Sequence, residues 1–298
     1  MLITRIITAV LLLCAVLPAL FWLPPLLWRA AVAAVITVAA WEWARMARLP
    51  GRLLWPYAFA TGLATALLLI GLPFLEGASE GASEGATLAG HQSADTQTAG
   101  HQTMAGVVRA SYGIAFLFWL AVVPLLFATG VRPGNRWGAL AGWCVLLPFG
   151  AAVADLRDLG PGLLISVMAL VWVADIAAYF AGRALGRRKL APGISPGKTW
   201  AGAVGGVAAV ALYALANWHY GNPLLAGARW WSVLLLAAGL LAVVSIIGDL
   251  FESAMKRAAG FKDSSHLLPG HGGVMDRIDS LTSTLPVAAL LLIWSGKL

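Results

Sequence analysis

The chain has 298 residues, of which 60% are hydrophobic and only 11% are charged. Soluble domains carry about 25% charged residues, and the apolar runs here are continuous rather than alternating. This composition excludes a soluble domain, a disordered chain and a β-barrel. The net charge of +7 reflects basic residues on one side of the predicted membrane spans, so no nucleic-acid partner is expected.

The apolar runs predict an all-α, polytopic integral membrane protein, a helical bundle with about nine transmembrane helices. Each run approaches the roughly 20 residues that cross a bilayer as a helix. The pair Pro24-Pro25 separates the first two spans, because a helix rarely continues through two prolines. The predicted spans are 5–24, 27–44, 53–75, 107–128, 138–154, 162–182, 200–218, 231–251 and 281–296.

The distribution of lysine and arginine gives a predicted orientation. Most of the 20 basic residues follow the second, fourth, sixth and eighth spans or lie at the C-terminal end. By the positive-inside rule, that side of the membrane is cytoplasmic. We therefore expect the N-terminus outside, the C-terminus in the cytoplasm, and the polar run after the eighth span facing the cytosol.

The chain divides by polarity into two regions. Residues 1–160 carry few polar groups within the spans and are predicted to be a transmembrane scaffold, whereas residues 161–298 form the candidate catalytic region. Residues 76–106 are short polar repeats that cannot bury a core, so we expect a mobile low-complexity loop on the non-cytoplasmic side. Within the scaffold, Glu42 has Arg45 three residues later, which predicts a local, structural ion pair.

The eighth span ends in a polar helix face. Asp249, Glu252, Ser253 and Lys256 recur at helical spacing, with Asp249 at the membrane edge. An unpaired carboxylate there is costly, so Asp249 needs a metal ion, a cationic partner or an aqueous cleft. A buried ion pair with a neighbouring helix explains the same pattern equally well.

A similar acidic pattern opens the last span. Asp276 and Asp279 lie three residues apart, so with Asp249 three carboxylates could converge across two helices. Hard oxygen ligands suit Mg²⁺, which takes one or two carboxylates and completes its shell with water and phosphate. The sequence leaves open a second metal ion or a monovalent cation beside it.

The polar run between these helices has features of a polyphosphate site. Its glycine-rich turn, residues 269–273, allows backbone N–H groups to form an anion nest. His271 in this turn could bond a phosphate, transfer a proton or simply brace the turn. The cations around the carboxylates are Lys256, Arg257, Lys262 and Arg277.

A second candidate phosphate site precedes the seventh span. Ser195 is predicted as the N-cap of that span and Pro196 as its first helical residue. Lys198 and Thr199 then lie in the first turn, where free N–H groups and the helix dipole favour anions. The upstream glycines of a Walker A loop are missing.

Two further features concern packing. Gly202 and Gly206 have small-xxx-small spacing, which predicts tight packing of the seventh span on a neighbour. Asp175 lies about two turns inside the cytosolic end of the sixth span. It could join the metal site, but we favour an ion pair with Arg183 or Lys198.

The polar run resembles the signature of a known family without a break. From Ser253, through Lys256-Arg257, Lys262-Asp263 and Pro269-x-His271-Gly272-Gly273, to Asp276-Arg277-Ile278-Asp279, it is similar to the phosphatidate cytidylyltransferases, or CDP-diacylglycerol synthases. Supporting matches are Asp175-x3-Tyr179, the segment SPGKTWAGAVGG from residue 195, and Gly248-Asp249. The likeness covers roughly residues 170–285.

The resemblance implies transfer of a cytidylyl group from CTP to phosphatidate, with Mg²⁺ at a site open to the cytosol of a bacterial-type plasma (inner) membrane. It implies that Asp249 and Asp276 are metal ligands, with Asp279 in or next to the shell. These three carboxylates and Lys198 are the predicted catalytic residues. The predicted substrate-binding residues are Ser195, Lys198, Thr199, Lys256, Arg257, Lys262, His271 and Arg277.

Ala201 replaces an acidic residue usual in that family, and Gly197 stands where a lysine is common, so this segment departs from the family pattern at two positions. The expected partners are CTP, phosphatidate and membrane lipids, and a homodimer stays open. The first alternative is a membrane lipid kinase that uses CTP. A transporter of anionic metabolites predicts internal repeats, which are not visible, and the acidic motif of CDP-alcohol phosphotransferases is absent.

Overall fold

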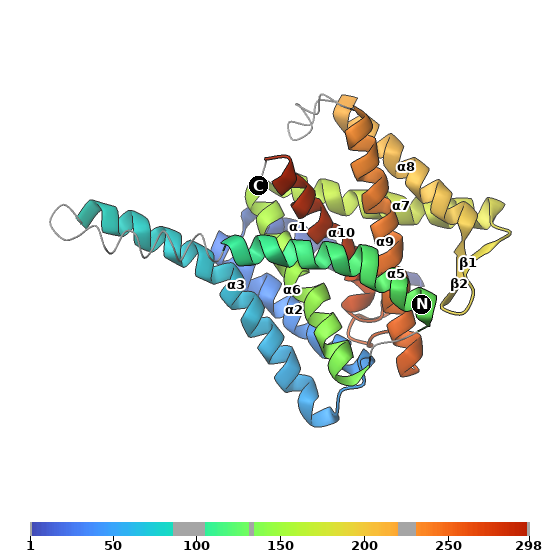
Figure 1. Ribbon diagram of the computed structural model, residues 1–298, viewed down its shortest axis with the longest axis horizontal. Helices are drawn as coiled ribbons and strands as arrows, with labels where there is room; N and C mark the ends of the chain where they lie inside the picture. Colours follow the sequence, from blue (N-terminus) through green and yellow to red (C-terminus); the bar gives the residue numbers. More distant parts are fainter. Residues whose placement is uncertain (1, 86–104, 131–133, 220–230, 297–298) are drawn as a thin grey trace.

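The computed structural model describes residues 2–85, 105–130, 134–219 and 231–296, which form a helical bundle with one small hairpin (Figure 1). Eight helices in this part of the chain are long and apolar enough to cross a membrane, and α1 adds a shorter apolar stretch, Ile7–Trp22. The predicted polytopic helical architecture with about nine spans is confirmed. The helices are α1 (Leu2–Trp22), α2 (Pro25–Met46), α3 (Gly51–Gly85), a fourth helix (Ala105–Thr129) that ends in α5 (Val123–Thr129), α6 (Asn135–Leu159), α7 (Pro161–Leu185), α8 (Trp200–His219), α9 (Trp231–Ala259) and α10 (Met275–Trp294).

Prolines set several helix boundaries. As predicted, the prolines separate the first two helices: Pro24 is the N-cap of α2 and Pro25 occupies its first turn. In the fourth helix, Pro124 follows a π-helical segment, η1 (Phe118–Val122). Because proline has no N–H to give to the preceding turn, a local change of hydrogen-bond register is expected there.

The predicted loop at 76–106 differs from the structure at both ends. Helix α3 continues to Gly85, and the fourth helix begins at residue 105. Residues 76–85 are therefore helical, and the loop prediction was wrong for them. The part of the predicted loop at 86–104 lies outside the described residues.

A β-hairpin replaces the predicted start of the seventh span. β1 (Lys189–Ala191) pairs antiparallel with β2 (Ser195–Thr199), and α8 begins only at Trp200. The N-cap predicted at Ser195 is wrong. Thr199 has this role instead, because its Oγ1 accepts a hydrogen bond from the Gly202 amide at 3.1 Å. Lys198 consequently lies on a strand.

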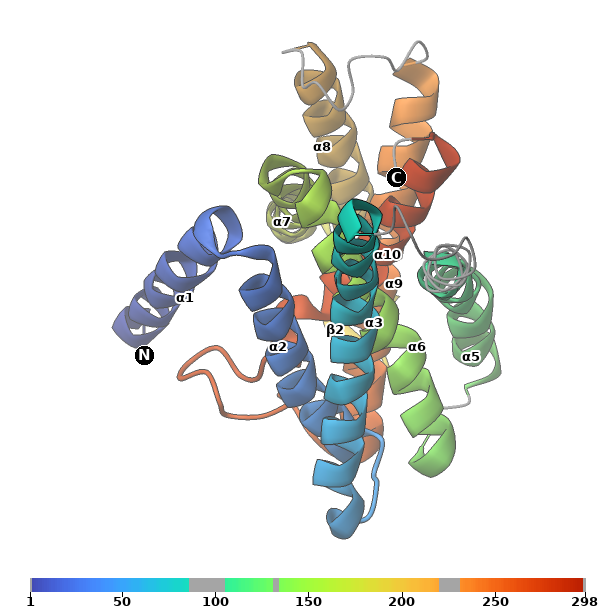
Figure 2. The same ribbon diagram turned by 90° about the vertical axis from the view of Figure 1, so that its left-hand side faces the viewer.

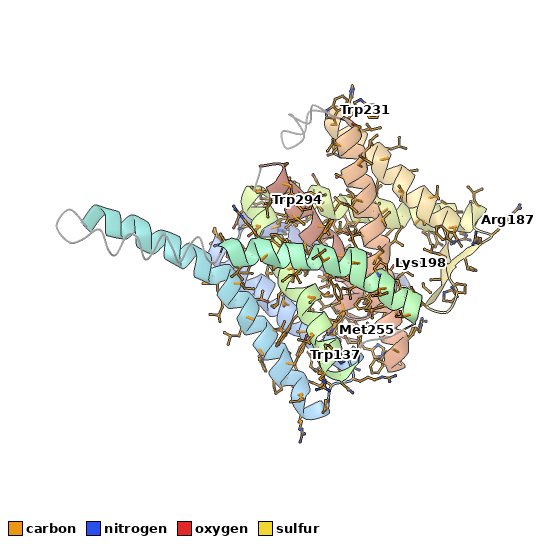
Figure 3. All side chains as sticks on the ribbon, viewed as in Figure 1. Trp137, Arg187, Lys198, Trp231, Met255 and Trp294 are labelled. Atoms are coloured by element: carbon orange, nitrogen blue, oxygen red, sulfur yellow. The ribbon has the colours of Figure 1, made fainter. Side chains whose placement is uncertain are left out.

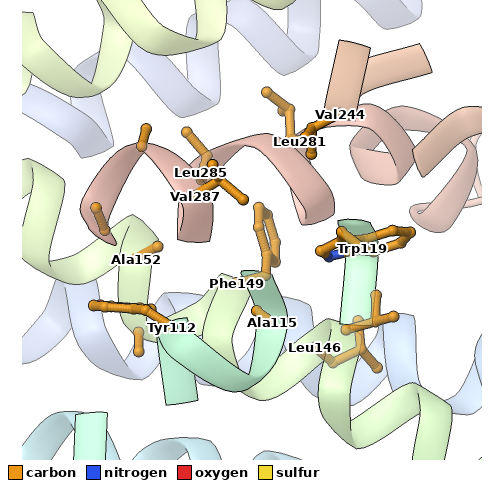
Figure 4. Packing of buried hydrophobic residues seen from close by; sticks show 14 of the residues in the cluster. Tyr112, Ala115, Trp119, Leu146, Phe149, Ala152, Val244, Leu281, Leu285 and Val287 are labelled. Atoms are coloured by element: carbon orange, nitrogen blue, oxygen red, sulfur yellow. The ribbon is translucent and has the colours of Figure 1, made fainter. Parts of the chain in front are cut away.

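The core is built around α6 and α10, the two most enclosed membrane helices of the described chain. Figure 4 shows Phe149 of α6 lying between Leu285 of α10 and Trp119 of the fourth helix. Helix α10 also buries hydroxyl groups: Ser283 donates to the carbonyl of Val244 in α9 at 2.9 Å. Such bonds satisfy polar groups where no water is available.

Helices α7, α8 and α9 pack together at the other side of the bundle, next to the hairpin (Figure 1). The predicted close packing through Gly202 and Gly206 is confirmed. A Cβ at Gly202 would lie 2.7 Å from the carbonyl oxygen of Ala178 in α7, and one at Gly206 would lie 3.0 Å from that of Ala174. The glycines let the two helix backbones approach closely.

The start of α1 lies on the same side of the bundle as the loop between α9 and α10. Thr8 of α1 donates a hydrogen bond to the carbonyl of Pro269 in that loop at 3.0 Å, and Figure 2 shows the loop reaching past α2 toward α1. If each helix crosses the membrane once, the N-terminus shares a side with the polar run and α10 ends on the opposite side. The prediction that placed the N-terminus and this run on opposite sides was wrong.

The α7–α8 contact gives a stability prediction. Replacing Gly202 with alanine forces the two backbones apart, and such overpacking costs about 1–3 kcal/mol. The matched control is Gly239→Ala in α9, where an added methyl group meets open space. Thermal unfolding in detergent should show a lower midpoint for the Gly202 variant only, and equal midpoints for both would contradict this packing.

Candidate functional site

A cavity of about 580 Å³ opens between α7, the hairpin, α8 and α9, and we call it the pocket. Its polar lining includes Asp175 and Arg183 of α7, Ser195 and Lys198 of β2, and Asp249 of α9. In Figure 3 Lys198 lies near α9, whereas Arg187 lies at the outer edge of the molecule. The hairpin therefore brings a cation to the wall of the pocket.

Asp249 and Lys198 form an ion pair across the pocket wall. Asp249 Oδ2 lies 2.5 Å from Lys198 Nζ, and both side chains keep about a quarter of their surface exposed, 27% and 26%. Ser253, one turn later, donates to the other carboxylate oxygen at 3.3 Å. Of the explanations predicted for Asp249, the structure shows a cationic partner inside an open cavity.

The glycine before Asp249 allows α9 and α10 to approach each other. A Cβ at Gly248 would lie 2.3 Å from Ser283 Oγ and 2.9 Å from the backbone oxygen of Asp279. The close approach brings the Asp249 and Asp279 carboxylates into electrostatic interaction. A glycine is therefore required at position 248, because any side chain there would clash with α10.

Asp175 faces the same pocket and interacts electrostatically with both Asp249 and Lys198. Two cationic partners were predicted for Asp175, Arg183 and Lys198. Arg183 donates a hydrogen bond to the hydroxyl of Tyr179 at 3.0 Å instead. Lys198 makes its ion pair with Asp249 while also attracting Asp175. Lys198 is thus shared between two acids that repel each other.

A second group of polar side chains holds Asp276, and we call Glu42, Glu252, Lys256, Ser264 and Asp276 the loop cluster. Lys256 Nζ lies 2.5 Å from Asp276 Oδ1 and also pairs with Glu252. Asp276 Oδ2 accepts hydrogen bonds from the amide and hydroxyl of Ser264, each at 2.9 Å. A further bond comes from the amide of Gly273 at 2.8 Å. Both oxygens of this carboxylate are therefore occupied.

Glu42 of α2 is fully buried in the loop cluster. Its Oε1 accepts from the hydroxyl of Ser265 at 2.6 Å and the amide of Val274 at 3.0 Å. Its Oε2 accepts from the hydroxyl of Ser264 at 3.1 Å and the amide of Met275 at 2.7 Å. Glu42 thus joins the loop and the first residue of α10 to the N-terminal half of the chain.

The local ion pair predicted between Glu42 and Arg45 was wrong. Arg45 extends the other way, over the rings of Trp41 and Phe261 at 4.9 and 5.2 Å, and its guanidinium donates to the carbonyl of Ser264 at 3.4 Å. A nearby basic residue in the sequence offered a simple partner, but four donors from distant residues compete better for a buried carboxylate.

The three predicted metal ligands do not form a single cluster. No group of three or more His, Cys, Asp or Glu side chains suited to a metal occurs among the described residues. Asp249 faces the pocket and interacts with Asp279, whereas Asp276 is held by Lys256 and the loop. One or two carboxylates suffice for Mg²⁺, and the interacting carboxylates of Asp249 and Asp279 are of the oxygen type that it takes. Their role as ligands stays a prediction, as does that of Asp276.

The other predicted substrate-binding residues divide into two groups. Ser195 and Thr199 both line the pocket, but Thr199 is largely buried and uses its hydroxyl to cap α8. His271 lies in a turn, and its backbone amide donates a hydrogen bond to the carbonyl of Leu268 at 2.8 Å. The remaining three cations, Arg257, Lys262 and Arg277, are exposed outside the pocket lining.

Sequence reasoning missed the part that Glu42 and Ser264 play. Ser264 falls at a position that the quoted signature leaves variable, so the pattern gives no signal for it. Glu42 did give one: a carboxylate within an apolar span needs several donors. Because Arg45 lies only three residues away, a local ion pair was predicted in place of these distant donors.

Comparison with known proteins places this geometry in a family. The model of the cytidylyltransferase family matches residues 3–294. The chain belongs to the cytidylyltransferase family. A phosphatidate cytidylyltransferase of Pseudomonas aeruginosa is 42% identical over 299 residues, covering 98% of this chain and 97% of the relative. One of Haemophilus influenzae is 37% identical, covering 95% of each, and one of Brucella suis is 45% identical over 186 residues, covering 60% of this chain and 64% of the relative.

The loop cluster gives a second stability prediction. In Lys256→Met, the buried carboxylates of Glu252 and Asp276 lose their shared cation, and breaking such a pair costs about 3–5 kcal/mol. Thermal unfolding in detergent should show a large drop in midpoint. Lys262→Met removes an exposed lysine five residues past the Lys256–Arg257 pair and should leave the midpoint unchanged. A Lys256 variant as stable as the Lys262 variant would show that the pairing contributes nothing.

Proposed function

We propose that this chain is a phosphatidate cytidylyltransferase: it transfers the cytidylyl group of CTP to phosphatidate, producing CDP-diacylglycerol and pyrophosphate. The observation that carries the proposal is the pocket with its Asp249–Lys198 pair, in a chain whose family likeness extends over nearly its full length. The helical bundle supports it, because a diacyl substrate keeps its chains in the bilayer while its phosphate enters a pocket between helices.

The chemistry joins two anions. A phosphate oxygen of phosphatidate attacks the α-phosphorus of CTP, the bond to the bridging oxygen breaks, and pyrophosphate leaves with the electron pair. Because a phosphate monoester is already anionic near neutral pH, the attack needs no strong general base. The site must instead reduce repulsion and align the reactants. Lys198, Arg183 and Lys189 line the pocket and supply positive charge for this.

A divalent cation bound at the site would neutralise the α-phosphate and the leaving pyrophosphate. Asp249 and Asp279 are the carboxylates we assign to holding Mg²⁺, and Asp276 stays a predicted ligand. Lys198 would then turn from Asp249 toward a substrate phosphate, which explains why both side chains keep access to the cavity.

The loop side of the bundle is proposed to face the cytosol of a bacterial-type plasma (inner) membrane, where CTP is available. The basic residues around the hairpin and the α9–α10 loop support this under the positive-inside rule. The start of α1 shares that side, so we propose that the N-terminus lies in the cytosol and the C-terminal end of α10 outside. A homodimer stays a prediction.

Asp249→Asn tests the carboxylate. It should keep the fold, because an amide is nearly isosteric, but lose about 100-fold or more in turnover. Purified protein in detergent, given phosphatidate, Mg²⁺ and CTP labelled in the cytidine ring, should transfer label into the lipid. A lipid kinase would leave that label in solution. Substantial turnover in the Asn variant would remove Asp249 from the mechanism, and unlabelled lipid from the parental protein would reject the proposed reaction.

Lys198→Ala tests the cation separately. The variant loses a phosphate contact and leaves Asp249 unpaired, so we expect a KM for CTP or phosphatidate raised about tenfold, with a smaller change in kcat. The control is Arg187→Ala, which removes an exposed basic residue beside the hairpin that does not line the pocket. Equal KM values for the two variants would contradict a substrate contact by Lys198.

A further inference from the structure

Glu42 makes contacts that a structural ion pair does not explain. It is one of the few fully buried charged side chains of the described chain, and it comes from α2, more than 200 residues before the loop that it contacts. Each of its two oxygens accepts two hydrogen bonds. A carboxylate has about four lone-pair directions, so Glu42 is saturated.

Two of the four donors are backbone amides at the start of α10. Val274 is the N-cap residue of α10 but makes no side-chain capping bond of its own, and Met275 is the first helical residue. Their amides reach Glu42 Oε1 and Oε2 at 3.0 and 2.7 Å. Glu42 therefore caps α10 from another helix, at the end where a negative charge is favourable.

The other two donors are the hydroxyls of Ser264 and Ser265, and Ser264 connects Glu42 to Asp276. Ser264 shares its hydroxyl between Glu42 Oε2 and Asp276 Oδ2, at 3.1 and 2.9 Å, and its amide also reaches Asp276. Gly273, whose amide donates to Asp276, has no room for a side chain: a Cβ would lie 2.3 Å from Glu42 Oε1 and 2.1 Å from Ser264 Oγ. Glu42 therefore contacts two of the residues that donate hydrogen bonds to Asp276, Ser264 and Gly273.

We infer that Glu42 is a positioning residue for the transfer reaction: it fixes the loop and the start of α10, and through them the orientation of the Asp276 carboxylate. The inference rests on the proposed function for its effect on turnover. The structural relation between Glu42 and the loop is independent of the substrate.

Glutamine is a sharp test of this role because it cannot replace the carboxylate in either orientation. Each oxygen of Glu42 faces one backbone amide, which can only donate. Whichever way the glutamine amide turns, its NH₂ group meets an N–H group. Aspartate keeps two acceptor oxygens but is one methylene shorter, so Glu42→Asp should restore part of what Glu42→Gln loses.

The matched control is Asp155→Asn. Asp155 lies on α6, within the N-terminal region 1–160, and accepts a hydrogen bond from the hydroxyl of Tyr112 at 2.7 Å, with no contact to the loop in the described residues. It is likewise a carboxylate within a membrane helix, so its variant measures the general cost of altering one. The milder variant Ser265→Ala removes the 2.6 Å bond to Glu42 Oε1 and the 3.1 Å bond that the Ser265 hydroxyl accepts from the Leu267 amide, and it leaves the bonds of Asp276 intact.

The experiment compares these full-length variants in detergent by kcat per folded molecule, by KM for CTP, and by hydrogen exchange of the segment 261–275. For Glu42→Gln we expect kcat to fall about tenfold or more, with KM within about threefold and faster exchange in this segment. Glu42→Asp should lie between Gln and the parental protein. Asp155→Asn should keep the parental kcat and the parental exchange of the segment.

Parental kcat in folded Glu42→Gln would overturn the inference and leave Glu42 a structural residue. If that variant does not fold, Ser265→Ala decides: a lower kcat with faster exchange supports positioning, and parental values overturn it. If the parental protein forms no CDP-lipid, the proposed function fails by itself. In that case, unchanged exchange in the Glu42 variants also rejects the positioning role, and faster exchange confined to 261–275 supports it.

Discussion

The organisation of this molecule depends on how it satisfies carboxylates inside an apolar bundle. An ionised acid away from water is stable only with cations or several hydrogen-bond donors. Three solutions are present. Asp249 pairs with a lysine from the hairpin, Asp276 is held by Lys256 and loop amides, and Glu42 is saturated by four donors. Each solution brings together segments distant in the sequence, so meeting the polar requirement also assembles the site.

This requirement joins the two halves of the chain. The sequence predicts a scaffold before residue 160 and a catalytic region after it; among the described residues, the pocket is lined by residues from 174 to 249. The loop that carries Asp276 is different, because its buried contacts are made with Glu42 of α2 and its outer turn contacts Thr8 of α1. A structural boundary at residue 160 is therefore weaker than polarity along the chain indicates.

Much of the fold follows from the sequence, because a long apolar helix is a local property. All nine predicted spans correspond to helices, and the Pro24-Pro25 break lies where it was expected. The start of α8 was wrong for an instructive reason: Ser195-Pro196 satisfies the local rule for a helix start, but pairing with Lys189–Ala191 extends the segment as a strand. Thr199, with weaker local evidence, then becomes the cap. Strand pairing is decided by a second segment, which a local rule cannot include.

The candidate site shows the same division between local and distant information. Helical spacing correctly placed Asp249 and Ser253 on one face, and steric need explains Gly248, Gly202 and Gly206. Spacing could not show which acid takes which cation. Lys256 lies four residues from Glu252 and seven from Asp249, yet it also reaches Asp276 across the loop, which leaves Asp249 to Lys198. Because the hairpin holds Lys198 on a strand, this cation approaches from outside the helix bundle. Asp249 is thus the predicted ligand whose counter-ion can leave without disturbing the buried core, which favours it as the first point of contact for an incoming cation.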